Sequence, residues 1–141
     1  MGPSTQRIKE KPMPFIHIRV AGENLPETKV QTLQTETTRL MAEILHKKAE
    51  LTAVFVEQVS PGSWSVGSAS VPAAAHMEAT ITAGTNTEEE KARFVGQAMT
   101  LLKSIIQQKL PLATYVVLRE IAAESWGYDG QTQAARRIAS T

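Results

Sequence analysis

Hydrophobic and polar positions along the chain first describe a strand, a helix and a second strand. Residues 14–20 alternate and are rich in β-branched side chains, which predicts a strand. Apolar positions then recur at helical spacing to about Lys48, and Pro26 suits the first helical position. A β-branched run at 51–59 predicts the second strand, and Ser-Pro-Gly-Ser at 60–63 predicts a turn.

The same order of elements returns in the second half of the chain. A strand is expected at about 77–83, and a helix follows it. Thr87 and Glu90 form the capping-box pattern at the start of this helix, with Asn86 as an alternative cap. The last long strand is expected at 113–121.

The repetition extends to individual residues. When each residue is compared with the one 62 positions later, 13 of the 59 pairs from Pro14 to Pro72 are identical. Ser63-Trp64 pairs with Ser125-Trp126, so both tryptophans of the chain fall in register. The sequence therefore predicts a duplicated unit.

The predicted fold is α+β: two tandem βαβ units form a four-stranded mixed sheet with two helices on one face. The repeats are expected at about 14–68 and 76–130, and right-handed crossovers place both helices on the same face. On the last strand, large apolar groups occur on both faces; Tyr115, Val117 and Arg119 share one, and Val116, Leu118 and Glu120 the other. We therefore expect the open face to meet another subunit.

Composition narrows the class of protein. The 141 residues contain 15 basic and 14 acidic side chains, so nothing indicates a nucleic-acid or membrane-surface partner. Cysteine is absent, which excludes disulfides and thiol chemistry, and no apolar run reaches the roughly 18 residues of a membrane span. We expect one cytoplasmic domain at 13–141, preceded by a flexible leader at 1–12 that comes from an upstream start codon or an added extension.

Pro14 is the candidate for chemistry. If translation began at Met13 and the methionine were removed, Pro14 would carry a free secondary amine. The pKa of an α-amino group, about 7.7–8.0, lies closer to neutrality than that of lysine, and burial or nearby cations lower it further. Such an amine suits a general base at pH 7. With twelve residues before Met13, however, the same nitrogen is an amide without basicity.

Met-Pro-Phe-Ile-His-Ile at 13–18, followed by Gly22, a long helix and a Ser-Trp hairpin, resembles the tautomerase superfamily. The small members, such as 4-oxalocrotonate tautomerase, have one βαβ unit, and the doubled members, such as macrophage migration inhibitory factor, have two and form trimers. The chain resembles a doubled member over residues 13 to about 134. The resemblance implies a homotrimer without cofactor, in which Pro14 moves a proton in a small 2-oxo or enol acid.

Further site residues follow from the same resemblance. Lys47 (or Lys48) matches the lysine that ends the first helix near the proline in doubled members. Tyr115 matches a tyrosine that lines the pocket across the subunit boundary. Trp64 and Trp126 match the hairpin aromatic of the small enzymes.

The chain also departs from the small enzymes. Asn24 lies near the position at which the small enzymes carry a substrate-binding arginine. Their second arginine corresponds to about Ala53 or Tyr115. Recognition of a dicarboxylate of the oxalocrotonate type is therefore not expected. Arg119 is a candidate carboxylate anchor because a guanidinium forms two parallel hydrogen bonds; its alternative is an exposed ion pair.

Each of these residues also has a purely structural interpretation. Pro14 can begin an edge strand, Lys47 can complement the helix dipole in the last turn, and Tyr115 and Trp126 can pack an interface. The three histidines show no metal-ligand spacing, so no metal site is predicted.

The predicted function is that of a tautomerase. Three rivals remain: a catalytically silent assembly or binding protein of the same fold, a dehalogenase or decarboxylase that uses the same proline, and a generic sheet that binds RNA or a small ligand. An RNA-binding sheet displays basic and aromatic residues on its central strands, which the run at 51–59 does not.

Overall fold

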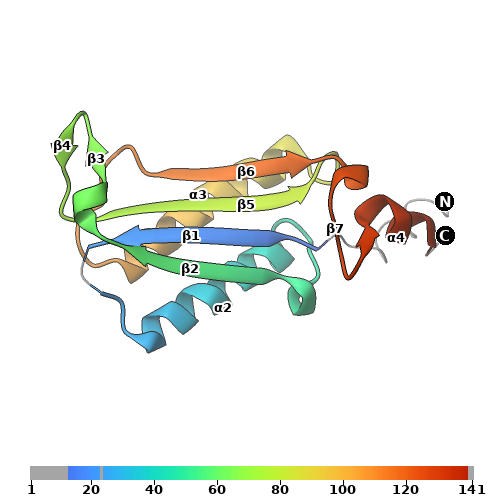
Figure 1. The fold of residues 1–141 in the computed structure, drawn as a ribbon, viewed down its shortest axis with the longest axis horizontal. Coiled ribbons are helices and arrows are strands. Elements are labelled where there is room, and N and C mark those ends of the chain that lie inside the picture. Colours follow the sequence, from blue (N-terminus) through green and yellow to red (C-terminus); the bar gives the residue numbers. More distant parts are fainter. Residues whose placement is uncertain (1–12, 23, 140–141) are drawn as a thin grey trace.

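The computed structural model describes residues 13–22 and 24–139 (Figure 1). Its main elements are β1 (Phe15–Ala21), α2 (Glu27–Glu43), β2 (Ala53–Val59), β5 (Ala74–Thr82), α3 (Glu88–Ile105) and β6 (Tyr115–Ile121). Shorter elements are β3 (Ser65–Val66), β4 (Ala69–Ser70), β7 (Gly127–Tyr128), β8 (Gln131–Thr132) and α4 (Gln133–Ala139). The expected leader at 1–12 lies outside the described residues. No helix in the described part is long and apolar enough to cross a membrane.

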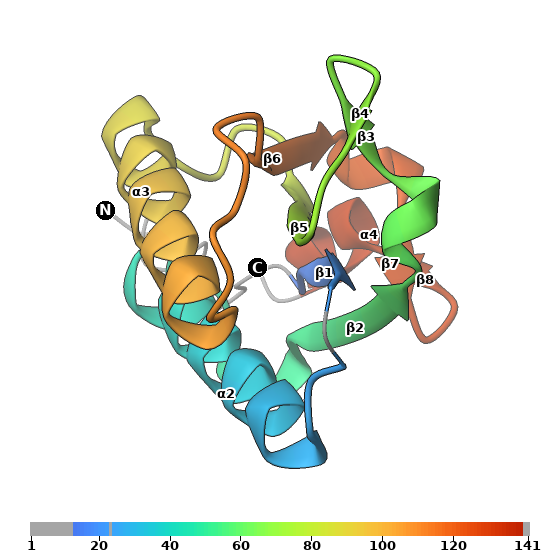
Figure 2. The same cartoon turned by 90° about the vertical axis from the view of Figure 1, so that its left-hand side faces the viewer.

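The predicted fold class is confirmed. The four long strands form one mixed sheet in the order β2-β1-β5-β6, with β1 parallel to β2, β5 parallel to β6, and the two halves antiparallel. Figure 2 shows α2 and α3 together on one side of this sheet. The two parallel pairs each need a crossover, and the helices supply it on the same face.

The duplication is visible in the element boundaries. The strands β2 and β6, the hairpin strands β3 and β7, and the hairpin strands β4 and β8 each begin and end 62 residues apart. The short 3-10 turns Pro61–Ser63 and Ala123–Ser125 obey the same offset. Trp64 and Trp126 each follow one of these turns and precede a hairpin, so their predicted equivalence is confirmed.

The core lies between the sheet and the two helices. The central strands contribute fully buried side chains such as Ile16 and Ile18 from β1 and Met77 from β5. Leu33 from α2 and Phe94 from α3 meet them without solvent exposure. Burial of these apolar groups is the main favourable term in folding, and it fixes which face of each strand points toward the helices.

The start of α3 agrees with its predicted cap. The Oγ1 atom of Thr87 accepts a hydrogen bond from the backbone N–H of Glu90 at 3.1 Å, and the Glu90 carboxylate accepts one from the backbone N–H of Thr87 at 2.9 Å. The alternative cap, Asn86, instead donates its amide to the Leu45 carbonyl at 2.9 Å. The capping box is therefore complete.

The predicted end of the first helix is wrong. Helix α2 ends at Glu43 rather than near Lys48, because the chain turns sharply at His46, whose φ is +59°. The backbone N–H of Lys47 then donates to the Met41 carbonyl at 3.0 Å. Lys47 consequently does not occupy the last helical turn, so its structural interpretation as a last-turn lysine that complements the helix dipole is wrong.

The open face of the sheet combines aromatic and charged side chains. Phe15, Phe55 and Tyr115 are 43%, 50% and 63% exposed. The imidazole of His17 stacks on the Phe55 ring, and its Nε2 lies 2.8 Å from the Glu57 carboxylate. Exposed rings of this size on an uncovered sheet are typical of an interface.

Candidate active site

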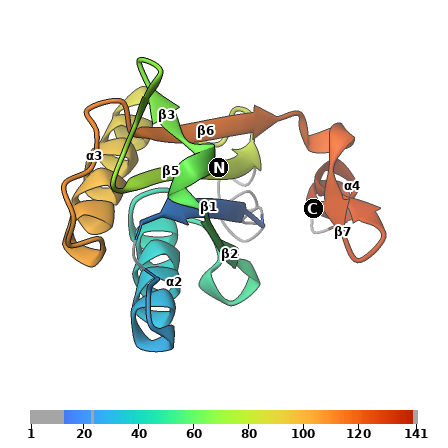
Figure 3. The same cartoon turned by 60° about the vertical axis from the view of Figure 1, so that its left-hand side comes forward.

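Pro14 lies at the end of the sheet where several segments converge. Strands β1 and β2 begin there, strands β5 and β6 end there, and α4 lies beyond this end of the sheet (Figures 1 and 3). The ring of Pro14 is buried, and its carbonyl accepts a hydrogen bond from the backbone N–H of Ala53 at 3.3 Å. The proline is thus held firmly at the start of β1.

Lys47 is buried at the same end of the sheet. Only 2% of the residue is exposed, and its ammonium donates to Thr85 Oγ1 at 2.9 Å. The Thr85 hydroxyl donates in turn to the carbonyl of Thr82, the last residue of the strand that runs beside the start of β1. Burial lowers the pKa of Lys47 from 10.5 to about 8, although the carboxylates of Glu90 and Glu120 oppose this effect.

The C-terminal helix supplies a residue that the sequence did not single out. Gln133, the first residue of α4, is 6% exposed. Its Nε2 donates to the Met13 carbonyl at 3.3 Å, and its backbone N–H donates to the Trp126 carbonyl at 2.9 Å. No periodic apolar pattern predicted this seven-residue helix. Gln133 is therefore recognised as a candidate site residue only from its hydrogen bond to Met13.

The two tryptophans occupy equivalent places in the repeats but opposite ends of the molecule. Trp126 follows β6 at the Pro14 end, where its indole N–H donates to Thr82 Oγ1 at 3.2 Å. Trp64 follows β2, which ends beside Ala21 at the far end of β1. Within one chain, the structure therefore brings Trp126 near Pro14 and does not bring Trp64 there.

Tyr115 and Arg119 lie on the open face of β6 at different distances from Pro14. Arg119 pairs with Thr80, which pairs with Phe15, so its backbone is two strands away, about 10 Å. Its guanidinium forms an ion pair with the carboxylate of Glu78 at 3.4 Å. Tyr115 begins β6 at the far end, so within one chain it does not reach Pro14.

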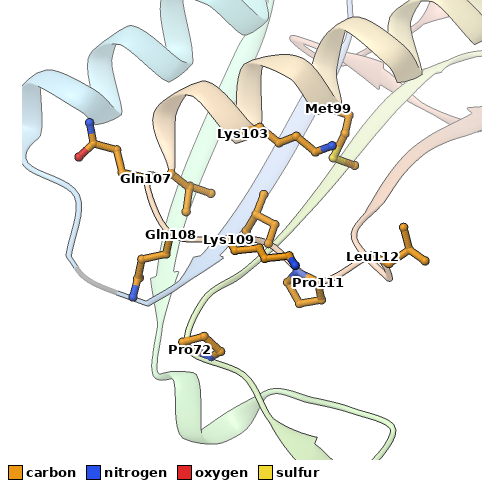
Figure 4. A pocket seen from close by; sticks show the side chains of 10 residues that line it. Pro72, Met99, Lys103, Gln107, Gln108, Lys109, Pro111 and Leu112 are labelled. Carbon is orange, nitrogen blue, oxygen red and sulfur yellow. The ribbon is translucent and has the colours of Figure 1, made fainter.

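A cavity of about 1020 Å³ lies at that far end, between the C-terminal part of α3 and the segment before β6 (Figure 4). Lys103, Lys109 and Leu112 are among the described residues that line it, and none of the lining residues is a predicted site residue. Lys109 is the repeat partner of Lys47, so the cavity occupies the equivalent place in the second repeat. The repeat partner of Pro14 is His76, within β5, so no terminal amine is available there.

No cluster of three or more metal-ligating side chains occurs in the described ranges 13–22 and 24–139. The polar groups at the Pro14 end include a buried lysine, two threonine hydroxyls and an amide, with the carboxylates of Glu90 and Glu120 near enough to act on the lysine. The ammonium, hydroxyl and amide donors stabilise negative charge on a small organic anion. A free Pro14 amine beside them would act as a proton acceptor.

Comparison with known proteins gives a family match for the first repeat. The family model described as Tautomerase enzyme matches residues 14–74, so the match begins at Pro14 and spans the first repeat. No curated protein matches the chain.

Solved structures share the fold over both repeats. The F6 fused 4-OT wild-type asymmetric trimer has a TM-score of 0.73 at 19% identity, covering 84% of this chain and 97% of that one. The macrophage migration inhibitory factor-like protein from Entamoeba histolytica has a TM-score of 0.69 at 17% identity, covering 85% and 98%. Pt0534 inactivated by 2-oxo-3-pentynoate has a TM-score of 0.77 at 13% identity, covering 86% and 97%. The first repeat thus matches the Tautomerase enzyme model, and the whole chain shares the doubled fold of the fused 4-OT and macrophage migration inhibitory factor-like structures.

Proposed function

We propose that the chain, in the form that begins at Pro14, is a cofactor-independent tautomerase of small 2-oxo or enol acids. The observation that carries this proposal is that the family match starts at Pro14, a buried proline at the head of the first strand. A secondary amine at this position is rigid, because its nitrogen belongs to a ring, and it is poorly solvated. Both properties favour a general base that works near neutral pH.

The proposed reaction moves one proton. The Pro14 nitrogen takes a proton from the carbon next to the keto group of the substrate. The electron pair of that C–H bond becomes a carbon–carbon double bond, while a pair of the carbonyl bond moves onto oxygen and forms an enolate. The proline ammonium then returns the proton to oxygen, or to a more distant carbon in a conjugated substrate, and the amine is regenerated.

Positive charge near Pro14 has two proposed roles. Lys47 is buried at the same end and hydrogen-bonded to Thr85. Its ammonium stabilises the enolate or carboxylate of the substrate, and its positive charge lowers the pKa of the proline amine. Arg119, two strands away from Phe15, anchors the carboxylate once its ion pair with Glu78 is exchanged for substrate. The indole of Trp126 forms part of the wall of the proposed substrate site.

The site is proposed to be complete only in a homotrimer. Tyr115 and Trp64 lie at the far end of their own chain, so each would reach a Pro14 only on a neighbouring copy. The exposed rings of Phe15 and Phe55 on the open face support this assembly, and the F6 fused 4-OT, which shares the fold, is a trimer. Sedimentation should give about three times the chain mass of 15.4 kDa, whereas 15.4 kDa at micromolar concentration would exclude the trimer.

The experiment compares three samples in the keto–enol conversion of phenylpyruvate. They are the chain from Met1, the chain from Pro14, and the chain from Pro14 with Pro14→Ala, which keeps a terminal amine but loses the ring. We expect activity mainly in the second sample, because acylation delocalises the nitrogen lone pair into the peptide bond. Equal activity of the first two samples excludes Pro14 as the base. If none of the three exceeds buffer, the chain is a catalytically silent binding or assembly protein.

A further inference from the structure

We propose that Gln133 belongs to the active site, where its side-chain amide donates a hydrogen bond to the substrate oxygen that becomes negatively charged. This inference rests on the proposed function and adds to it a further residue that contacts the reacting atoms. It assigns the C-terminal helix α4 a direct part in binding the enolate.

The position of Gln133 is fixed by the fold. The residue is 6% exposed, and its backbone N–H donates to the Trp126 carbonyl at 2.9 Å. This main-chain bond holds the start of α4 against the segment that follows β6. The side chain therefore has little freedom, and its Nε2 lies 3.3 Å from the carbonyl oxygen of Met13.

That carbonyl oxygen marks a place next to the reacting nitrogen. The carbonyl carbon of Met13 is bonded to the Pro14 nitrogen, so its oxygen lies about 2.2 Å from that nitrogen by covalent geometry. When Met13 is absent, a 2-oxo acid whose acidic carbon approaches the nitrogen brings its keto oxygen, two bonds away, into the same small volume. The Met13 carbonyl is thus a stand-in for the substrate carbonyl.

Removal of Met13 leaves the Gln133 amide without this acceptor. A buried donor without a partner destabilises the folded protein, but it is ready for a ligand oxygen. Donors placed in advance around developing negative charge lower a reaction barrier, because they need no reorganisation when the charge appears. Gln133 fits this requirement since its hydrogen bond strengthens as the carbonyl becomes an enolate.

Two other side-chain donors at this end have acceptors that stay in the chain when Met13 is removed. The Trp126 indole donates to Thr82, and the Lys47 ammonium donates to Thr85. Gln133 is distinguished from both because its acceptor, Met13, belongs to the segment that the proposed maturation removes.

The test uses the chain that begins at Pro14, with Gln133→Leu and Gln133→Glu. Leucine keeps the apolar volume and loses the donor, and glutamate replaces the donor by a group that repels an enolate. Gln131→Leu, two residues earlier on an exposed position of β8, is the matched control. We expect kcat for phenylpyruvate to fall about 10- to 100-fold in both Gln133 variants and to remain unchanged in the control. The acid limb of the pH dependence of kcat, which reports the pKa of the Pro14 amine, should not move in Gln133→Leu. The Gln133 amide donates to the substrate and not to the amine.

Two further readouts separate this role from a structural one. The thermal midpoint of Gln133→Leu should be equal to or above that of its parent in the Pro14 form, whereas in the chain from Met1 it should fall, because the Met13 carbonyl loses its donor. A lower midpoint in both forms, together with unchanged kcat, makes Gln133 a structural tie and overturns the proposal.

Oxalate, a planar dianion that resembles an enolate, serves as a binding probe that needs no turnover. Calorimetry should give an oxalate dissociation constant about tenfold weaker for Gln133→Leu than for its parent. If the parent does not convert phenylpyruvate but binds oxalate with this dependence, the tautomerase function fails and the role of Gln133 stands. If the parent is active and neither kcat nor oxalate binding responds to Gln133→Leu, the role of Gln133 fails alone. The role of Gln133 is also contradicted if the parent and Gln133→Leu bind oxalate equally well, or if neither of them binds oxalate.

Discussion

Lys47 should make the stability of the protein depend on pH in a way that its replacement by methionine removes. The lysine is 2% exposed, and burial lowers its pKa from 10.5 to about 8. In the unfolded chain the side chain is solvated and retains its proton up to about pH 10.5. Between pH 8 and 10.5 the unfolded state therefore binds more protons than the folded state, and the free energy of unfolding rises with pH.

The magnitude follows from the two pKa values. The difference between 10.5 and about 8 corresponds to about 3 kcal/mol. Below pH 8 the native protein carries a buried ammonium that donates to the Thr85 hydroxyl, and above pH 10.5 the amine is neutral in both the folded and the unfolded state. Relative to Lys47→Met, the unmodified chain should therefore gain about 2 to 3 kcal/mol of stability between pH 7.5 and 10.

The assay is urea unfolding of both proteins at one fixed concentration and at several pH values across this range. Lys109→Met is the matched control, because Lys109 is the repeat partner of Lys47 but is exposed, so its variant should follow the parent at every pH. A stability difference between Lys47→Met and its parent that stays constant from pH 7.5 to 10 would refute the reasoning. It would mean that the Lys47 ammonium is solvated in the folded protein.

Two other changes test the fold and the assembly. Thr87→Ala removes the hydroxyl that accepts from the backbone N–H of Glu90, and it should lower the free energy of unfolding by about 1 kcal/mol in a urea titration; an unchanged midpoint would mean that the capping box contributes nothing. Phe55→Asp places a charge at a ring that is 50% exposed on the open face, and it should shift sedimentation toward the monomer; an unchanged mass would remove this face from the interface.

Much of the fold was predictable because the duplication constrains it. Period-2 and helical patterns located the long strands and helices, and the offset of 62 residues predicted equivalent places for Trp64 and Trp126. The end of α2 was not predictable from periodicity, since apolar Ile44 and Leu45 continue the pattern while the backbone turns at His46, whose φ is +59°. A positive φ is uncommon at any residue other than glycine, and no glycine marks this turn.

The candidate site was predictable only in part. Pro14 and Lys47 could be proposed from their places in the chain, but the burial that lowers the pKa of Lys47 depends on the turn after α2. Gln133 could not be found, because its hydrogen bond to Met13 joins residues 120 positions apart. Its helix spans only seven residues, too short for a reliable periodic pattern.

The most direct measurement of the central claim is the site of reaction with 2-oxo-3-pentynoate, the compound that inactivates Pt0534. A nucleophilic amine adds to its alkyne, which is conjugated to a keto group, and forms a stable covalent bond. After incubation of the chain from Pro14, peptide mass spectrometry should find a single adduct on Pro14 together with loss of phenylpyruvate turnover. The chain from Met1 should carry no adduct at Pro14, because its Pro14 nitrogen is an amide. Labelling of both forms to the same extent, or an adduct on a lysine in place of Pro14, would contradict the assignment of Pro14 as the base.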